Sequence, residues 1–391
     1  MPVFSCGGMR YQFKWQDQPF KDVPKDNQAN LAATIERAID VGVNHIETAR
    51  GYGTSERQLG YVLGDFPRES LIVQTKVAPT EDPKLFRQHV NESLERLQLD
   101  HVDLLALHGL NNQQTLDWAI RDGGCFEEAQ RFREAGKCRH VGFSTHASPE
   151  IVKAAVEFGE PETGKGFDYV NLHWYYIFQR NWAAVAAAAE RDMGVFIISP
   201  SDKGGQLYKP PRKLQRLCEP LSPMVFNDLF CLSRPEVHTL SIGASRPTDF
   251  DEHLKTLPLL DEATTHLEPI VRRLEQAMQE VTGEISPEAH LLDLPPWEDT
   301  PGEMNLAIIG WLLNLARGWD LKEYAKMRFN LLGNADHWFP GNRPKQLSDI
   351  DAQALQKALG QHPLAREAAI ILTDSLGLLG GADKKRLSAS E

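Results

Sequence analysis

At 391 residues the chain has room for one large domain with a smaller second one, or for two or three ordinary domains. Its net charge of −12 argues against nucleic acid or an anionic membrane surface as a partner, because both would repel it. No apolar run approaches the length of a membrane span, and the first residues lack the basic and apolar regions of a signal peptide. We therefore expect a cytoplasmic globular protein with no membrane or nucleic-acid partner.

Short apolar strands alternate with amphipathic helices over the first 260 residues. The predicted strands cover residues 2–10, 43–46, 71–76, 102–108, 140–144, 169–172, 195–199 and 237–242. The predicted helices cover residues 28–42, 56–63, 83–97, 126–135, 149–158 and 182–192. Repeated βα units imply parallel strands with right-handed crossovers, and eight of them favour a closed (β/α)8 TIM barrel over an open sheet. Residues 1–260 are therefore predicted to form a barrel.

The alternation stops near residue 261. Apolar residues then recur at helical spacing over residues 267–278, and the stretches 306–315 and 355–372 also have the pattern of helices. Residues 261–391 are therefore predicted to form a smaller, all-helical second domain, broken near residues 294–297 and 338–341.

Chemically active side chains fall at the ends of successive predicted strands. Glu47, Lys76 and His108 each stand at a strand C-terminus, where TIM barrels place their chemistry, and Tyr52 follows Glu47 in a Gly-rich loop. A charged lysine lowers a tyrosine pKa from its usual value of about 10, and a carboxylate keeps that lysine charged and aimed. Such a tyrosine can act as a general acid. The structural alternative is a loop aromatic, an ion pair and a hydrogen-bonded histidine.

These residues also carry a family resemblance. An acid with a tyrosine five residues later, then Thr-Lys at 75–76 and Leu-His-Gly at 107–109, resembles the tetrad of the aldo/keto reductase family. The resemblance implies that Tyr52 protonates a carbonyl oxygen, Lys76 lowers its pKa, Glu47 holds Lys76, and His108 orients the carbonyl. The family's acid is Asp, so Glu47 is a departure.

The resemblance extends to the binding of a nicotinamide cofactor. Residues 142–146, Gly-Phe-Ser-Thr-His, are similar to the family's Gly-Val-Ser-Asn-Phe, and this implies that Ser144 and Thr145 bind the carboxamide. Asn171 matches the family's Gln in the same role. Ser199-Pro200 matches the Ser-Pro-Leu that cradles the pyrophosphate. Ile198 stands where many members stack a tyrosine, so cover for the nicotinamide is expected from Ile198 itself or from Trp174.

The segment after the last strand implies the adenosine end of that site. Gly243 begins it, Glu252 would meet the adenine amino group, and Ser245 and Arg246 would hold a 2′-phosphate. Asp249 has the wrong charge for the phosphate-binding arginine of some members, so NADP(H) is preferred and NAD(H) remains open. No Gly-x-Gly-x-x-Gly loop indicates a Rossmann domain, and neither a flavin nor a metal is implied.

The five cysteines show neither a disulfide framework nor zinc-site spacing, being odd in number and scattered: Cys6, Cys125, Cys138, Cys218 and Cys231. A helical tail with ferredoxin-like cysteine clusters occurs in one subgroup of the family, and residues 324–329 and 335–341 resemble it. Cys231 is the last cysteine, so the tail lacks the thiolates that an iron–sulfur cluster needs. We expect a ferredoxin-type module without clusters.

Two functions follow from these observations. The first is a cytoplasmic NADP(H)-dependent reductase of an aldehyde or ketone. The second is a catalytically weak barrel that binds NADP(H) as a redox sensor or scaffold, with the helical tail as a surface for a protein partner. The Glu47 and Ile198 departures and the absent clusters favour the second; the four reactive residues at the family's spacing favour the first.

Overall fold

The structure is a computed structural model that describes residues 1–160, 165–334 and 338–385. The chain divides into two compact units. The barrel unit comprises Met1–Gly204 and Asn227–Ala263, and the helical unit comprises Gly205–Phe226 and Thr264–Glu391. Residues 335–337, part of the segment that resembles a ferredoxin-type tail, lie outside the described residues.

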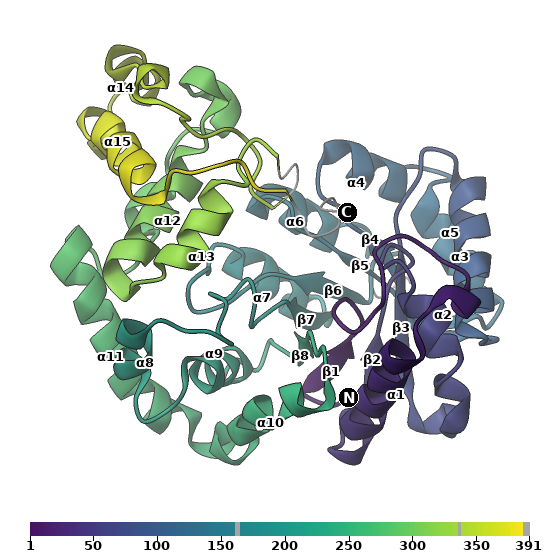
Figure 1. Cartoon of the computed structure of the whole chain (residues 1–391). Helices are drawn as coiled ribbons and strands as arrows, with labels where there is room; N and C mark the ends of the chain where they lie inside the picture. The colour runs from purple at the N-terminus through teal and green to yellow at the C-terminus, as the bar shows by residue number, and fades with distance from the viewer. Residues whose placement is uncertain (161–164, 335–337, 386–391) are drawn as a thin grey trace. The chain divides into compact units, whose positions relative to one another are not determined.

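The barrel unit is built on eight parallel strands, each paired with its neighbours in chain order, with β8 also pairing with β1 (Figure 1). The predicted TIM barrel is therefore confirmed. The strands are β1 (Phe4–Gly7), β2 (His45–Glu47), β3 (Ile72–Val77), β4 (Val102–His108), β5 (Cys138–Ser144), β6 (Tyr169–Leu172), β7 (Gly194–Ile198) and β8 (Thr239–Ile242).

Helices connect these strands, as right-handed βα crossovers require. They are α1 (Lys25–Asp40), α2 (Ser55–Gly60), α3 (Pro83–Leu97), α4 (Gln113–Ile120), α5 (Cys125–Glu134), α6 (Pro149–Val156), α7 (Trp182–Glu190), α8 (Arg212–Cys218) and α9 (Pro223–Leu232); α10 (Phe250–His253) follows β8. Helix α4 was not predicted. It is only eight residues long, and it is fixed at its start by a capping box in which Asn112 Oδ1 accepts from Thr115 N at 2.9 Å.

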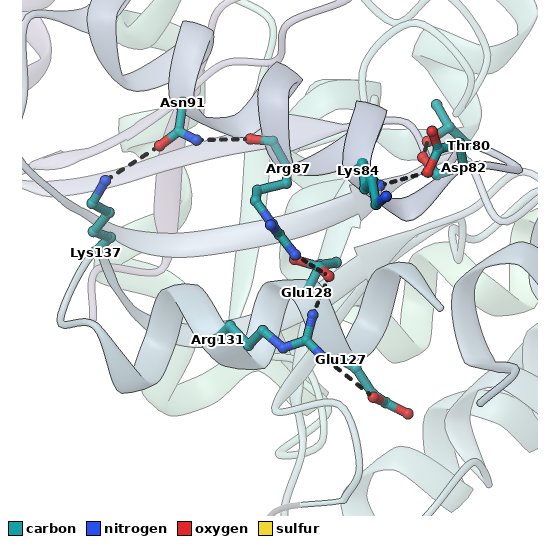
Figure 2. Close-up of polar contacts among 9 residues, drawn as sticks. All are labelled: Thr80, Asp82, Lys84, Arg87, Asn91, Glu127, Glu128, Arg131 and Lys137. Carbon is teal, nitrogen blue, oxygen red and sulfur yellow. Dashed lines mark hydrogen bonds and ion pairs between the residues drawn. The ribbon is translucent and has the colours of Figure 1, made fainter. Parts of the chain in front are cut away.

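A polar network joins α3 and α5 on the outside of the barrel (Figure 2). Arg87 donates to both carboxylate oxygens of the buried Glu128, at 2.6 and 2.7 Å, and Arg131 pairs with the same carboxylate. Lys137 Nζ donates to Asn91 Oδ1 at 3.2 Å nearby. The hydrogen bonds from Arg87 hold the pKa of Glu128 below its ordinary value, although burial acts in the opposite direction.

Alternate strand residues face the barrel interior, because side chains on a strand have a period of two. The apolar part of this interior is a cluster of Leu104, Ala106, Tyr169 and Phe196, with Ile72 packed against it. Continuing the same alternation along β2, β3 and β4 brings Glu47, Lys76 and His108 to the interior at the C-terminal ends of their strands. The strand period therefore gathers these three side chains at one end of the barrel.

The helical unit contains α8 together with α11 (Ala263–Thr282), α12 (Leu306–Trp319), α13 (Lys322–Phe329), α14 (Ala352–Leu359) and α15 (Ala368–Leu379). Trp319 Nε1 donates to Leu274 O at 2.9 Å and ties α12 to α11. The single helix predicted over residues 355–372 is wrong: the chain ends α14 before Gly360, whose φ is +55°, and Pro363 follows. Within the described residues, no helix has both the length and the apolar character needed to cross a bilayer.

Candidate active site

A buried ion pair lies at the C-terminal ends of β2 and β3. Lys76 Nζ donates to Glu47 Oε1 at 2.7 Å and to Thr48 O at 3.1 Å. The two side chains are only 1% and 4% exposed, so the pair is shielded from water and salt. The second carboxylate oxygen, Oε2, accepts no hydrogen bond from any described residue. Removing two charges from water is costly, and the contact with Lys76 offsets that cost only while both partners are present.

The loop after β2 brings Tyr52 beside this pair. Gly53 has a φ of +53°, and a Cβ there would lie 1.8 Å from Lys14 O, so the loop requires glycine at this position. Lys76 Nζ then lies 5.4 Å from the centroid of the Tyr52 ring. Trp15 packs its ring edge-on against Tyr52 at 6.3 Å. Local backbone geometry therefore sets where the phenol stands.

His108 completes the cluster from the end of β4. Its ring meets that of Tyr52 at a centroid separation of 5.5 Å and an interplanar angle of 85°. The four predicted residues therefore lie together. Glu47 is paired with Lys76, Lys76 lies beside the ring of Tyr52, and that ring meets the ring of His108.

Two effects act in opposite directions on the Tyr52 hydroxyl. Desolvation raises the pKa of Tyr52, and the positive charge of Lys76 lowers it; desolvation prevails, so the pKa is above its ordinary value. The residue pattern predicts the effect of Lys76 and not the larger effect of burial. Cys6, on the adjacent strand β1, is fully buried, and burial together with the charge of Glu47 raises the pKa of its thiol. Cys6 is accordingly an unreactive thiol.

The predicted carboxamide-binding residues differ in how they are already bonded. Thr145 Oγ1 donates to Leu110 O at 2.7 Å and accepts from Ala147 N at 3.0 Å, so its hydroxyl hydrogen is committed to the loop. Ser144 Oγ accepts from Gly109 N at 3.1 Å. Asn171 is fully buried and its Nδ2 has no hydrogen-bond partner among the described residues. Asn171 is therefore the donor best suited to a carboxamide oxygen.

The segment after β7 carries the predicted pyrophosphate residues. Ser199 has a φ of +56°, and Lys203 N donates to its carbonyl at 3.0 Å, which closes a turn over Pro200. Ile198 precedes the turn. The ring of Trp174 stacks on Phe230 and packs against Trp182, at centroid separations of 4.9 and 5.0 Å, and is only 2% exposed. Trp174 is thus part of the core, and Ile198 remains as the predicted cover.

The predicted 2′-phosphate ligands are paired with a carboxylate. Ser245 donates to Asp249 Oδ2 from both N and Oγ, at 2.9 and 2.8 Å, and Arg246 Nε donates to Oδ1 at 3.0 Å. The neighbouring Glu252 accepts from Lys255 Nζ at 2.5 Å. Gly243 has no side chain, and a Cβ there would lie 3.0 Å from Arg10 Cδ.

These groups fit a nicotinamide dinucleotide. The unpaired Nδ2 of Asn171 is a buried donor that needs an acceptor, and the Arg246 side chain, 70% exposed, is accessible to an anion. Asp249 is the feature that opposes a 2′-phosphate.

Three groups that contact this site were not predicted from the sequence. They are the Thr48 carbonyl, the side chain of Gln74, whose Nε2 donates to Asn171 Oδ1 at 2.8 Å, and the side chain of His45, whose Nε2 lies 3.0 Å from Gln74 Oε1. Each side chain stands two residues before a predicted site residue, so the strand period was the signal that would have identified both. The Thr48 carbonyl has no such signal, because every residue type carries one.

A closed eight-stranded barrel with an acid, a lysine, a tyrosine and a histidine at its C-terminal end defines the class of protein. The chain belongs to the aldo/keto reductase family, whose family model matches residues 5–210, just over half of the chain.

Individual relatives match the chain only in part and at modest sequence identity. An uncharacterized oxidoreductase of Schizosaccharomyces pombe is 32% identical over 162 residues, covering 38% of this chain and 50% of the relative. The L-galactose dehydrogenase of Arabidopsis thaliana is 34% identical over 124 residues, covering 29% and 38%. The chain thus spans half or less of the length of these relatives. An aldo-keto reductase structure from Bacillus halodurans superposes with a TM-score of 0.55 at 19% identity, covering 68% of this chain and 91% of that one, which shows the shared fold.

Proposed function

We propose that the protein is a cytoplasmic NADP(H)-dependent reductase that converts an aldehyde or ketone to an alcohol. The observation that carries this proposal is the buried Lys76–Glu47 pair at 2.7 Å, with its ammonium 5.4 Å from the Tyr52 ring. A structural ion pair would not need a phenol and an imidazole in contact beside it at the mouth of a barrel.

The chemistry divides among these side chains. The cofactor, when bound, supplies a hydride to the carbonyl carbon of the substrate. Tyr52 donates its proton to the carbonyl oxygen, and its raised pKa keeps that proton in place at neutral pH. Lys76 stabilises the phenolate that remains, and Glu47 keeps Lys76 charged and aimed. His108, whose ring meets that of Tyr52, orients the carbonyl.

The cofactor would be held by three groups of residues. Asn171 would donate to the carboxamide with support from Ser144 and Thr145, Ser199 and Pro200 would hold the pyrophosphate, and Gly243, Ser245, Arg246 and Glu252 would bind the adenosine end. Arg246 favours NADPH because only NADPH carries a 2′-phosphate, and NADH binds through the remaining contacts. The names of the relatives support the redox class and leave the carbonyl substrate open.

Titration of the purified full chain with NADPH and NADH, followed by a panel of carbonyl compounds, tests the proposal. Tyr52→Phe removes the proton and keeps the ring, so turnover should fall by roughly 10²–10⁴ while cofactor affinity stays nearly unchanged. Full activity in Tyr52→Phe would contradict the mechanism. Cofactor binding without turnover of any carbonyl would favour the sensor or scaffold instead.

We further infer that residues 261–391 are a ferredoxin-type module that carries no iron–sulfur cluster and is available to a protein partner. The support is the sequence itself, in which no cysteine follows Cys231. Protein purified without oxygen should contain neither iron nor labile sulfide. Stoichiometric amounts of both would overturn this inference.

A further inference from the structure

A chain of buried polar side chains crosses the inside of the barrel. His45 Nε2 lies 3.0 Å from Gln74 Oε1, and Gln74 Nε2 donates to Asn171 Oδ1 at 2.8 Å. All three residues are fully buried. Because β4 and β5 lie between β3 and β6 in the barrel order, the bond from Gln74 to Asn171 spans the interior rather than joining paired strands.

The directions of the bonds in this chain follow from the orientations of the Gln74 and Asn171 amides. An amide oxygen only accepts, so His45 Nε2 must carry the hydrogen that Gln74 Oε1 receives. Burial lowers the pKa of His45 to about 4, so the ring is neutral at physiological pH and its Nδ1 has no hydrogen. Gln74 Nε2 then donates to Asn171 Oδ1, and the Nδ2 of Asn171 is left as an outgoing donor.

The cost of this arrangement points to a role beyond packing. The apolar cluster beside it shows that hydrocarbon side chains fill the same interior, and burying three polar side chains there is unfavourable unless every group is bonded. Asn171 Nδ2 has no partner among the described residues. An amide held firmly at one end and unpaired at the other is typical of a group that waits for a ligand.

We propose that Gln74, supported by His45, is a positioning residue that fixes the amide of Asn171 so that its Nδ2 donates to the carboxamide oxygen of the nicotinamide cofactor. This inference rests on the proposed function, since it requires that the barrel binds a nicotinamide dinucleotide. Gln74 stands two residues before Lys76, and His45 two residues before Glu47. Strands β2 and β3 therefore have two roles. Glu47 and Lys76 support the proton donor Tyr52, and His45 and Gln74, two residues earlier on the same strands, support the amide of Asn171.

The test uses Gln74→Met, which keeps the length of the side chain and removes its hydrogen bonds to His45 and Asn171 as well as the longer one, 3.5 Å, to the Tyr169 hydroxyl. Affinity is measured for the reduced dinucleotide that wild type binds more tightly and for its matching ADP-ribose fragment, which lacks the nicotinamide. We expect the dinucleotide to bind about fivefold more weakly, the equivalent of one hydrogen bond, and the fragment to bind as in wild type. In the Gln74→Met/Asn171→Leu double variant the loss should equal that of Asn171→Leu alone, because Gln74 acts through Asn171.

Each other outcome has a definite meaning. An equal loss of affinity for dinucleotide and fragment would show that Gln74 only supports the fold. An unchanged affinity for the dinucleotide would show that Gln74 does not position Asn171 for the cofactor. Either result overturns the inference. If Gln74→Met does not fold, His45→Phe cuts the outer bond alone and should give a smaller loss with the same selectivity for the nicotinamide. A wild type that binds neither dinucleotide overturns the proposed function itself, whereas Tyr52-dependent turnover with an insensitive Gln74 overturns only this inference.

Discussion

Arg246 and Asp249 form an ion pair, with Arg246 Nε 3.0 Å from Asp249 Oδ1, at the position that we propose for a 2′-phosphate. Asp249 also accepts both hydrogen bonds that Ser245 offers. These hydrogen bonds hold the pKa of Asp249 below its ordinary value even though burial acts to raise it, so the carboxylate is charged at neutral pH. In the proposed site, NADPH would therefore compete with an anion that belongs to the protein.

Asp249→Asn should strengthen NADPH binding and leave NADH binding unchanged. The substitution removes the competing charge and keeps an oxygen that accepts from Ser245. Because Arg246 is largely exposed, its ion pair contributes at most about 1 kcal/mol, and the expected gain is up to about fivefold. Fluorescence titration with both cofactors measures it.

Arg246→Ala is the matched control for the same site. It should weaken NADPH and spare NADH, since only NADPH presents the 2′-phosphate. Equal losses for the two cofactors would contradict the assignment of Arg246, and a gain for NADH in Asp249→Asn would contradict that of Asp249.

Glu47→Asp tests whether the site is adapted to its longer acid. Glu47 reaches Lys76 at 2.7 Å, so a shorter side chain should open that contact and let Lys76 shift away from Tyr52. Errors of about 1 Å in such positions can cost roughly 100-fold in rate, and we expect turnover to fall by up to this amount. Steady-state kinetics measures the turnover, and the affinity for the cofactor should stay unchanged. A rise in turnover would instead identify a decayed reductase in which aspartate restores the lost geometry.

The barrel should become less stable as the pH is lowered, because His45 is buried in its neutral form. Burial lowers the pKa of His45 from 6.5 to about 4, against the charge of Glu47, which acts to raise it. Between these values the unfolded chain binds one more proton than the folded one, so the free energy of unfolding decreases as pH falls from 6.5 to 4. The full effect is about 3 kcal/mol.

Urea unfolding of wild type and His45→Phe across this range measures that contribution. The difference between the two slopes isolates the contribution of His45 from those of all other titrating groups. Parallel pH profiles for the two proteins would show that His45 is not buried in its neutral form.

Glu128 and its neighbour Glu127 offer a direct comparison on the outside of the barrel. Glu128 is buried and bonded to Arg87 through both oxygens. Glu127 is half exposed and 3.9 Å from Arg131, and its Oε1 accepts from Gly123 N at 2.8 Å, a bond that a glutamine oxygen can also accept. Glu128→Gln should lower the free energy of unfolding by about 1–2 kcal/mol, because it weakens charge-assisted bonds, and Glu127→Gln by less than about 0.5 kcal/mol. Equal effects would mean that burial adds nothing to the Glu128 network. Thermal or chemical unfolding distinguishes these cases.

Residues with regular spacing could be predicted from the sequence, and residues defined by contacts across the fold could not. Strand period and βα alternation are enough to place Glu47, Lys76 and His108 at one end of the barrel. Asp249 and Arg246 stand three residues apart at the start of a helical turn, a spacing at which charged side chains meet, so this pair was also within reach of the sequence. The hydrogen bond from Gln74 to Asn171 joins residues 97 positions apart, and only the closure of the barrel brings them together. The prediction of one helix over residues 355–372 was wrong for a local reason. Gly360 and Pro363 are helix-ending residues visible in the sequence, but the prediction gave more weight to the apolar pattern on either side of them.

The two-residue period that β3 imposes on Gln74 and Lys76 also determines what kind of sequence change this barrel tolerates. A substitution at either position alters one contact and leaves the other in place. Inserting or deleting a single residue at the start of Ile72–Val77, with a one-residue shift of the rest of the strand, would turn both side chains outward at once and bring their neighbours Val73 and Thr75 into the interior. We therefore expect β3 to tolerate replacement of its residues better than a change in its length, and the surface loops to be the places where the chain can gain or lose residues.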